Sequence, residues 1–236
     1  MQRLFDCMVN LGLCYSQIGR YEEAEKMHRT ALDGYVVVLG LKKPYTQNAL
    51  VCLMNFLNDR SRSDEAVLIA KDYLGRYEDL LGESHTFTLD LMSKLGGYLY
   101  AARRLVEAQA VYERCLNLLM AQQQPDQKEI ARLQYNLANA HDDLGHDEIA
   151  IAFYETSLKT RLEVLGPHDP QTADTMANLS LLLYNQGHLQ RAVDLLDSSQ
   201  VTREKSDPEK FVLVRDSAMA ERWRKELTES IDIDEE

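Results

Sequence analysis

The feature that most constrains this chain is an internal repeat of 42 residues. When the sequence is shifted against itself by that length, identical residues align without a gap in three columns. The alanine column contains Ala24, Ala66, Ala108, Ala150 and Ala192, and the leucine columns contain Leu11, Leu53, Leu95, Leu137 and Leu179, and Leu32, Leu74, Leu116 and Leu158. Such a period predicts an array of one repeated structural unit, in which each repeat packs on its neighbours.

Each repeat is expected to form a pair of helices. Between residues 129 and 144, apolar residues recur at spacings of three and four, which is typical of one helix face: Leu133, Leu137, Ala140 and Leu144. Asp126 is suited to cap this helix, and Gly145 suits the left-handed residue that ends it. A second helix is expected from about residue 147 to residue 165, ended by Gly166 and the proline after it. Asp169 and the following proline then begin the next repeat.

Small residues are expected where the two helices of a repeat approach closely, because larger side chains would overpack the contact. The alanine column meets this need, and a second small column contains Gly12, Gly96, Ala138 and Ser180. Met54 interrupts the second column, and Ser61 stands in the same repeat where a turn glycine is expected. In the third repeat, residues 122–125 replace the usual Leu-Gly, which predicts a loop of different shape.

The pattern of small and aromatic residues resembles the tetratricopeptide repeat. Its residues are Leu11, Gly12, Tyr15, Gly19, Ala24 and Ala31. The stretch 165–172, followed by Asn178 and Leu179, is similar to the long repeats of kinesin light chains and of regulatory arrays in fungal and bacterial signalling proteins, and stretch 81–88 is a weaker copy. The resemblance covers residues 3 to 207. It implies an all-α, right-handed superhelical solenoid of about five antiparallel helix pairs.

Three regions are expected along the chain. Residues 1–207 form the repeat array, residues 208–228 form a C-terminal capping helix, and residues 229–236 form an acidic, disordered tail. The capping helix is expected because a stacked array exposes an apolar face at its end. Its apolar residues are Phe211, Val212, Val214, Ala218, Met219, Trp223 and Leu227.

The resemblance also implies a binding surface, since in that family the first helix of each repeat lines a concave groove that binds extended peptides. The residues placed there are Asn10, Asn55, Lys94, Arg132, Asn136, Asn139 and Asn178. Asparagine amides can donate to and accept from a peptide backbone. Asn178 matches the asparagine that kinesin light chain-like repeats use for this purpose. Lys94 and Arg132 can pair with carboxylates.

Acidic residues in or near the same face oppose a strongly basic groove: Asp6, Asp59, Asp90, Asp143 and Asp174. A ligand that carries basic residues is therefore as consistent with the sequence as an acidic one. The tail 231–236 alternates apolar and acidic residues, and one hypothesis is that it docks near Lys94 and Arg132. The alternative is that it only solvates the end of the chain.

Charge and motifs exclude several other classes of protein. The net charge of −12 argues against binding to nucleic acid or anionic lipid. No apolar run reaches the roughly 20 residues of a membrane span, and Asp6 lies where a signal peptide would be apolar. No cysteine pair has metal or redox spacing, and His141 and His146 do not match the i, i+4 spacing of helical zinc sites. We expect a cytoplasmic protein without metal or cofactor.

The sequence predicts a binding protein rather than an enzyme. It contains no glycine-rich phosphate loop, no G-x-S-x-G elbow and no H-E-x-x-H motif. The predicted function is an adaptor that binds an extended peptide segment of a protein partner in its concave groove. The alternative is a structural or regulatory module that self-associates, or packs on another domain, through its array ends or convex surface. The start at Met1, inside an expected first helix, indicates either a fragment or an apolar end that associates.

Overall fold

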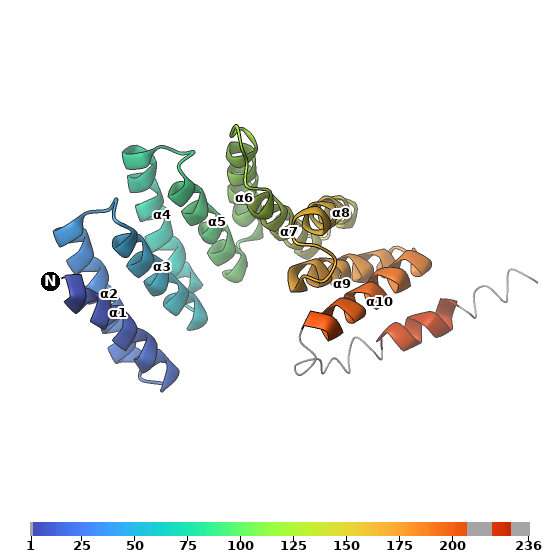
Figure 1. Cartoon of the computed structure of the whole chain (residues 1–236), viewed down its shortest axis with the longest axis horizontal. Helices are drawn as coiled ribbons and strands as arrows, with labels where there is room; N and C mark the ends of the chain where they lie inside the picture. The colour runs from blue at the N-terminus through green and yellow to red at the C-terminus, as the bar shows by residue number, and fades with distance from the viewer. Residues whose placement is uncertain (1, 207–218, 228–236) are drawn as a thin grey trace, which may run out of the picture. The chain divides into compact units, whose positions relative to one another are not determined.

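The computed structural model describes residues 2–206 and 219–227, and every regular element in these ranges is an α-helix (Figure 1). The helices are α1 (Gln2–Gln17), α2 (Tyr21–Leu39), α3 (Pro44–Asp59), α4 (Ser63–Leu81), α5 (Thr86–Ala101), α6 (Leu105–Met120), α7 (Gln127–Asp143), α8 (Asp147–Val164), α9 (Pro170–Asn185) and α10 (Leu189–Ser206). A further helix occupies residues 219–227. The prediction of an all-α array of helix pairs is confirmed.

The chain divides into two compact units. The N-terminal unit is Met1–Val111 and the C-terminal unit is Tyr112–Glu236, so the boundary falls within α6. In the N-terminal unit, α1 packs on α2, α2 on α3, α3 on α4 and α4 on α5. In the C-terminal unit, α7 packs on α8, α8 on α9 and α9 on α10. Within each unit, a helix therefore packs mainly on its neighbours in sequence, as expected for stacked repeats.

The backbone turns follow the 42-residue period. The turn inside each helix pair contains a residue of positive φ, and these residues are Gly19, Ser61, Arg103, Gly145 and Gly187. A second series, Gly40, Gly82 and Gly166, follows the second helices, with φ of 78°, 91° and 89°. The equivalent Gln124 is not among the positive-φ residues. The third repeat therefore has a differently shaped loop, as residues 122–125 predict.

Replacing Ser61 with glycine should stabilise the N-terminal unit by about 0.5–1 kcal/mol. Ser61 has φ of 59°, a left-handed conformation that is costly for a residue with a Cβ atom, and the greater freedom of glycine in the unfolded chain offsets part of the gain. Urea unfolding of the variant measures the change. Gly145→Ser is the reciprocal control and should destabilise. A lower midpoint for Ser61→Gly would show that the serine side chain makes a stabilising contact.

The small columns lie at the contact between paired helices. Every member of the alanine column is fully buried. A Cβ atom added to Gly12 would lie 2.8 Å from Cε1 of His28 on α2, so glycine is required opposite this ring. In the next repeat the equivalent residues are Met54 and Ala70, both fully buried, and the order of sizes is reversed. Met54 is therefore matched by a small residue at the position equivalent to His28, which explains the interruption of the column.

The helix at residues 219–227 packs against α9 and α10 (Figure 1). The ring of Trp223, which is 2% exposed, stacks on Tyr184 with centroids 4.3 Å apart. The Tyr184 hydroxyl donates to Glu226 at 2.7 Å, and Arg224 pairs with Asp197 of α10. The remainder of the predicted capping helix, residues 208–218 and 228, and the predicted tail 229–236 lie outside the described residues. The predicted boundaries at 207 and 228 stay a prediction.

Candidate peptide-binding surface

The predicted binding residues are divided between the two units. The N-terminal unit contains Asn10, Asn55 and Lys94, and the C-terminal unit contains Arg132, Asn136, Asn139 and Asn178. A single groove that runs past all seven side chains therefore stays a prediction.

In the C-terminal unit, two predicted residues meet in a hydrogen-bonded cluster with two tyrosines. The Asn–Tyr cluster consists of Asn139 and Tyr135 on α7, Tyr154 on α8 and Asn178 on α9. The Nδ2 atom of Asn178 is 3.0 Å from the Tyr135 hydroxyl and 3.3 Å from Oδ1 of Asn139. The Tyr154 hydroxyl also donates to Oδ1 of Asn139. The cluster thus joins two successive repeats.

The bonds inside the cluster leave a defined set of groups for a ligand. Oδ1 of Asn139 accepts two hydrogen bonds, which occupies both of its lone pairs, and its Nδ2 group remains to donate. The amide nitrogen of Asn178 is used, and its Oδ1 atom remains to accept. Asn136 is half-buried on α7, and its side chain forms no hydrogen bond with other described residues. This face therefore offers both amide donors and amide acceptors.

Both predicted cations are paired with carboxylates on their own helix. Arg132 forms a two-bonded contact with Glu129, with Nε–Oε2 at 2.8 Å and Nη2–Oε1 at 2.5 Å. In the N-terminal unit, Nζ of Lys94 is 3.5 Å from Oδ1 of Asp90. A carboxylate ligand would have to compete with these partners. This pairing favours a neutral ligand or one of mixed charge.

The other predicted residues of the N-terminal unit do not form a cluster of this kind. Asn55 on α3 accepts a hydrogen bond of 2.7 Å from the hydroxyl of Tyr98 on α5. Asn10 is exposed on α1. The arrangement of amides that a peptide backbone requires is therefore better developed in the C-terminal unit.

Sequence reasoning missed Arg161 of α8, which is 4% exposed and lies beside the Asn–Tyr cluster. Its Nη1 atom donates to the carbonyl of Gln171 at 2.5 Å and to Oγ1 of Thr175 at 2.7 Å. Its guanidinium lies 4.5 Å from the centre of the Tyr135 ring. Burial lowers the pKa of Arg161. The sequence could have indicated this residue, because Arg161 stands at a position of the repeat that holds tyrosine in two earlier repeats, Tyr35 and Tyr77.

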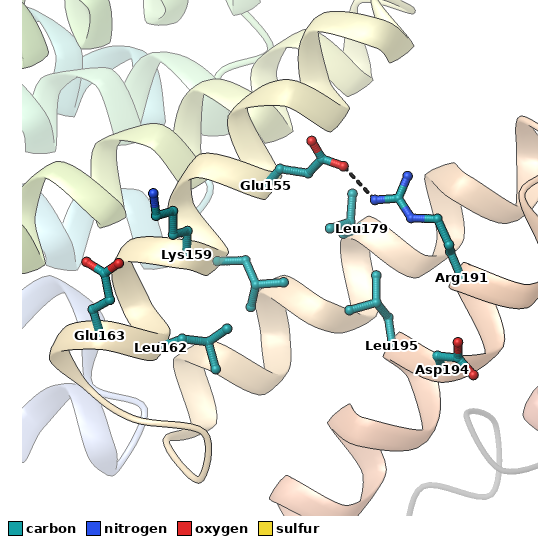
Figure 2. Close-up of a pocket in the computed structure, with 9 residues that line it drawn as sticks. Glu155, Lys159, Leu162, Glu163, Leu179, Arg191, Asp194 and Leu195 are labelled. Atoms are coloured by element: carbon teal, nitrogen blue, oxygen red, sulfur yellow. Dashed lines mark hydrogen bonds and ion pairs between the residues drawn. The ribbon is translucent and has the colours of Figure 1, made fainter.

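A second groove is lined mainly by the second helices of two repeats, and none of the seven predicted residues lines it. It lies between α8 and α10 and has a volume of about 620 Å³ (Figure 2). Leucines line its apolar part: Leu158, Leu162, Leu179 and Leu195. Charged residues surround them, and Arg191 pairs with Glu155 at 2.7 Å, as the dashed line in Figure 2 shows. This outer groove is relevant to the alternative function, which is packing on another domain or self-association through the array ends or the convex surface.

His141 and His146 lie together at the turn between α7 and α8. Their Nδ1 atoms are 3.3 Å apart, and the His141 ring stacks on Phe153. Within the described residues, no group of three or more His, Cys, Asp or Glu side chains is arranged to hold a metal ion. Among the same residues, no helix combines the length and apolar character of a membrane span.

Comparison with known families identifies the repeat. Two family models, both described as tetratricopeptide repeat, match residues 129–200 and 4–44. Residues 4–44 and 129–200 are tetratricopeptide repeats, and the fold of the chain is that of kinesin light chain-like repeats. Comparison with curated proteins finds no sequence match.

Solved structures support the fold at low sequence identity. The kinesin light chain-like repeats of Podosopora anserina superpose with a TM-score of 0.69 at 17% identity, over 87% of this chain and 98% of that chain. BtubC (BKLC) from P. vanneervenii gives 0.74 at 18% identity, over 87% and 82%. A Rap protein complexed with competence and sporulation factor gives 0.67 at 13% identity, over 86% of this chain and 55% of that chain.

Proposed function

We propose that this chain is a protein-interaction adaptor that binds an extended peptide segment of a partner on the α7–α9 face of its C-terminal unit. The observation that carries the proposal is the Asn–Tyr cluster, which leaves Nδ2 of Asn139 and Oδ1 of Asn178 available for a ligand. An extended peptide has backbone N–H and C=O groups without internal partners, and amide side chains satisfy both.

Two further observations support this proposal. The hydrogen bonds within the cluster fix the orientation of both amides before a ligand arrives, which lowers the conformational entropy lost on binding. A structurally similar Rap protein has been solved in complex with competence and sporulation factor. The pairing of Arg132 with Glu129 favours a peptide that is neutral or of mixed charge on this face.

A peptide-library selection tests the proposal. Peptides that enrich on the unmodified chain should lose at least tenfold enrichment on Arg132→Glu/Asn136→Ala, because the variant removes the Asn136 amide and places a second negative charge beside Glu129. Lys159→Glu/Glu163→Ala on the outer groove is the matched control and should retain enrichment. Circular dichroism checks that both variants are folded. Retention of every peptide by the first variant would exclude this face.

The second candidate function is docking of a protein segment in the outer groove between α8 and α10. The apolar part of this groove, with charged residues around it, favours the candidate. The same selection separates the two functions, since peptides lost only on Lys159→Glu/Glu163→Ala would place binding in the outer groove. The expectations of no enzymatic activity, no nucleic-acid or membrane partner and a cytoplasmic location remain predictions, as does homo-association through the array ends.

A further inference from the structure

Arg161 of α8 is a buried cation that forms no ion pair with the described residues. Its Nη1 atom makes both of its hydrogen bonds, to the carbonyl of Gln171 and to Oγ1 of Thr175. The Nε and Nη2 groups form no hydrogen bond with the residues that the structure describes, and neither group is fully enclosed. Burial of a charge is costly unless a partner compensates it. Arg161 therefore presents two donor groups that the described fold leaves unused.

The charged side chains around Arg161 do not supply this partner. Asp169 and Asp174 attract its guanidinium, whereas Arg132 of α7 repels it. Asp169 is engaged as the N-terminal cap of α9, and Asp174 pairs with Arg203 of α10 at 3.0 Å. Both carboxylates therefore act on Arg161 without forming an ion pair with it.

Other repeats show which group is missing at this place. In two of them, a donor on the second helix bonds to a carboxylate on the first: Tyr35 to Asp6, and Arg203 to Asp174. Both donors stand at the repeat position of Arg161, and both carboxylates stand at the repeat position of Arg132. The fourth repeat therefore has arginine at both positions, and it lacks the carboxylate that joins the two helices elsewhere.

The guanidinium of Arg161 lies next to the Asn–Tyr cluster. The Tyr135 ring lies 4.5 Å from it, and the Tyr135 hydroxyl bonds to Asn178. Thr175, which Arg161 contacts, precedes Asn178 by three residues on α9, a distance of about 4.5 Å along the helix axis. A peptide whose backbone is bound by the amides of the cluster can therefore place a side chain or its terminus near Arg161.

We propose that Arg161 binds one carboxylate of the peptide on the α7–α9 face, so that the ligand must carry an acidic residue or a free C-terminus at that place. This inference rests on the proposed function of that face. Nε and Nη2 are the same two groups with which Arg132 binds both oxygens of Glu129. A planar guanidinium fits a carboxylate in this two-bonded way. Because Arg132 keeps its own partner, a single carboxylate on an otherwise neutral or basic peptide satisfies this face.

A double-mutant cycle tests the missing carboxylate without any ligand. Arg132→Asp restores the carboxylate of the first and last repeats, and Arg161→Leu introduces the residue of the third repeat, Leu119. In urea unfolding, the midpoint of Arg132→Asp should lie about 0.5 M above the value that the same change gives in the Arg161→Leu background, after correction for Arg161→Leu itself. An equal shift in both backgrounds would overturn the proposal, because Arg161 would then gain nothing from a carboxylate.

The peptides that enrich on the α7–α9 face are the probes of the second test. Each is synthesised with its acidic residues changed singly to Asn or Gln, and with a free or an amidated C-terminus. Removal of one carboxylate should raise Kd at least tenfold on the unmodified chain, and less than twofold on Arg161→Leu. The change that has this effect shows whether the carboxylate comes from a side chain or from the C-terminus.

Lys159→Leu is the matched control, because this cation of α8 lines the outer groove and should leave the tenfold difference unchanged. Peptides that bind without dependence on any carboxylate would overturn this inference and leave the proposed function intact. An equal dependence on Arg161→Leu would also overturn it and would assign the contact to another cation. Failure of every peptide to enrich would exclude the proposed function together with this inference.

Discussion

Replacing Trp223 with alanine should lower the free energy of unfolding of the C-terminal unit by about 3–5 kcal/mol. The indole is 2% exposed and stacks on Tyr184, and it packs in one core with residues of α8, α9 and α10. Its removal leaves a cavity that the surrounding helices can fill only in part. It also exposes the apolar side of α10 that the helix at 219–227 covers.

Chemical denaturation followed by circular dichroism measures this loss. Trp223 is the only tryptophan of the chain, so its fluorescence in the unmodified protein reports unfolding of the same region. Trp223→Phe is the matched control and should retain more than half of the stabilisation, because an aromatic ring can still stack on Tyr184. A loss below about 1 kcal/mol for Trp223→Ala would mean that the helix at 219–227 does not cap the array in solution.

Replacing Gly12 with methionine should destabilise the N-terminal unit by about 3 kcal/mol. Even a Cβ atom at Gly12 would lie within 2.9 Å of two atoms of the His28 ring. His28 is 1% exposed and has no room to move outward without disturbing Phe56, which is also buried. The protein accepts methionine at the equivalent position 54, where the opposing position is Ala70.

The double variant Gly12→Met/His28→Ala should recover about 2 kcal/mol of that loss, because it reproduces the Met54 and Ala70 combination. His28→Ala alone supplies the remaining corner of the double-mutant cycle. It removes a ring whose nitrogens have no hydrogen-bond partner among the residues that the structure describes and whose pKa is lowered by burial. Urea unfolding of the four proteins gives the coupling energy. Additive losses would show that the two positions do not compensate each other.

The helix pairs could be predicted closely because their signals are local. Apolar spacing and capping residues predicted helices at about 129–144 and 147–165, and the structure has α7 at Gln127–Asp143 and α8 at Asp147–Val164. Ser61 was recognised at a turn position, but Arg103 was not. Glycine marks the turn in three of the five repeats, at Gly19, Gly145 and Gly187. These glycines do not by themselves indicate that Arg103 adopts the same positive φ.

The candidate site could be predicted only in part, because its geometry depends on packing between repeats. The sequence predicted Asn139 and Asn178 as separate groove residues, whereas in the structure the two amides are hydrogen-bonded to each other, and Tyr135 and Tyr154 bond to them. Side-chain periodicity cannot give the approach of α9 to α7 that creates this contact. The pairing of Arg132 with Glu129 was readable from their spacing of three residues and was missed.

The reversed sizes at Gly12 and His28, and at Met54 and Ala70, also affect how such an array can grow by gene duplication. A recombination break between the two helices of one pair can bring methionine against histidine, and these side chains would then compete for one space. A break between pairs keeps each compensating couple together. The helix pair, rather than the single helix, is therefore the segment that can be copied or exchanged without loss of packing.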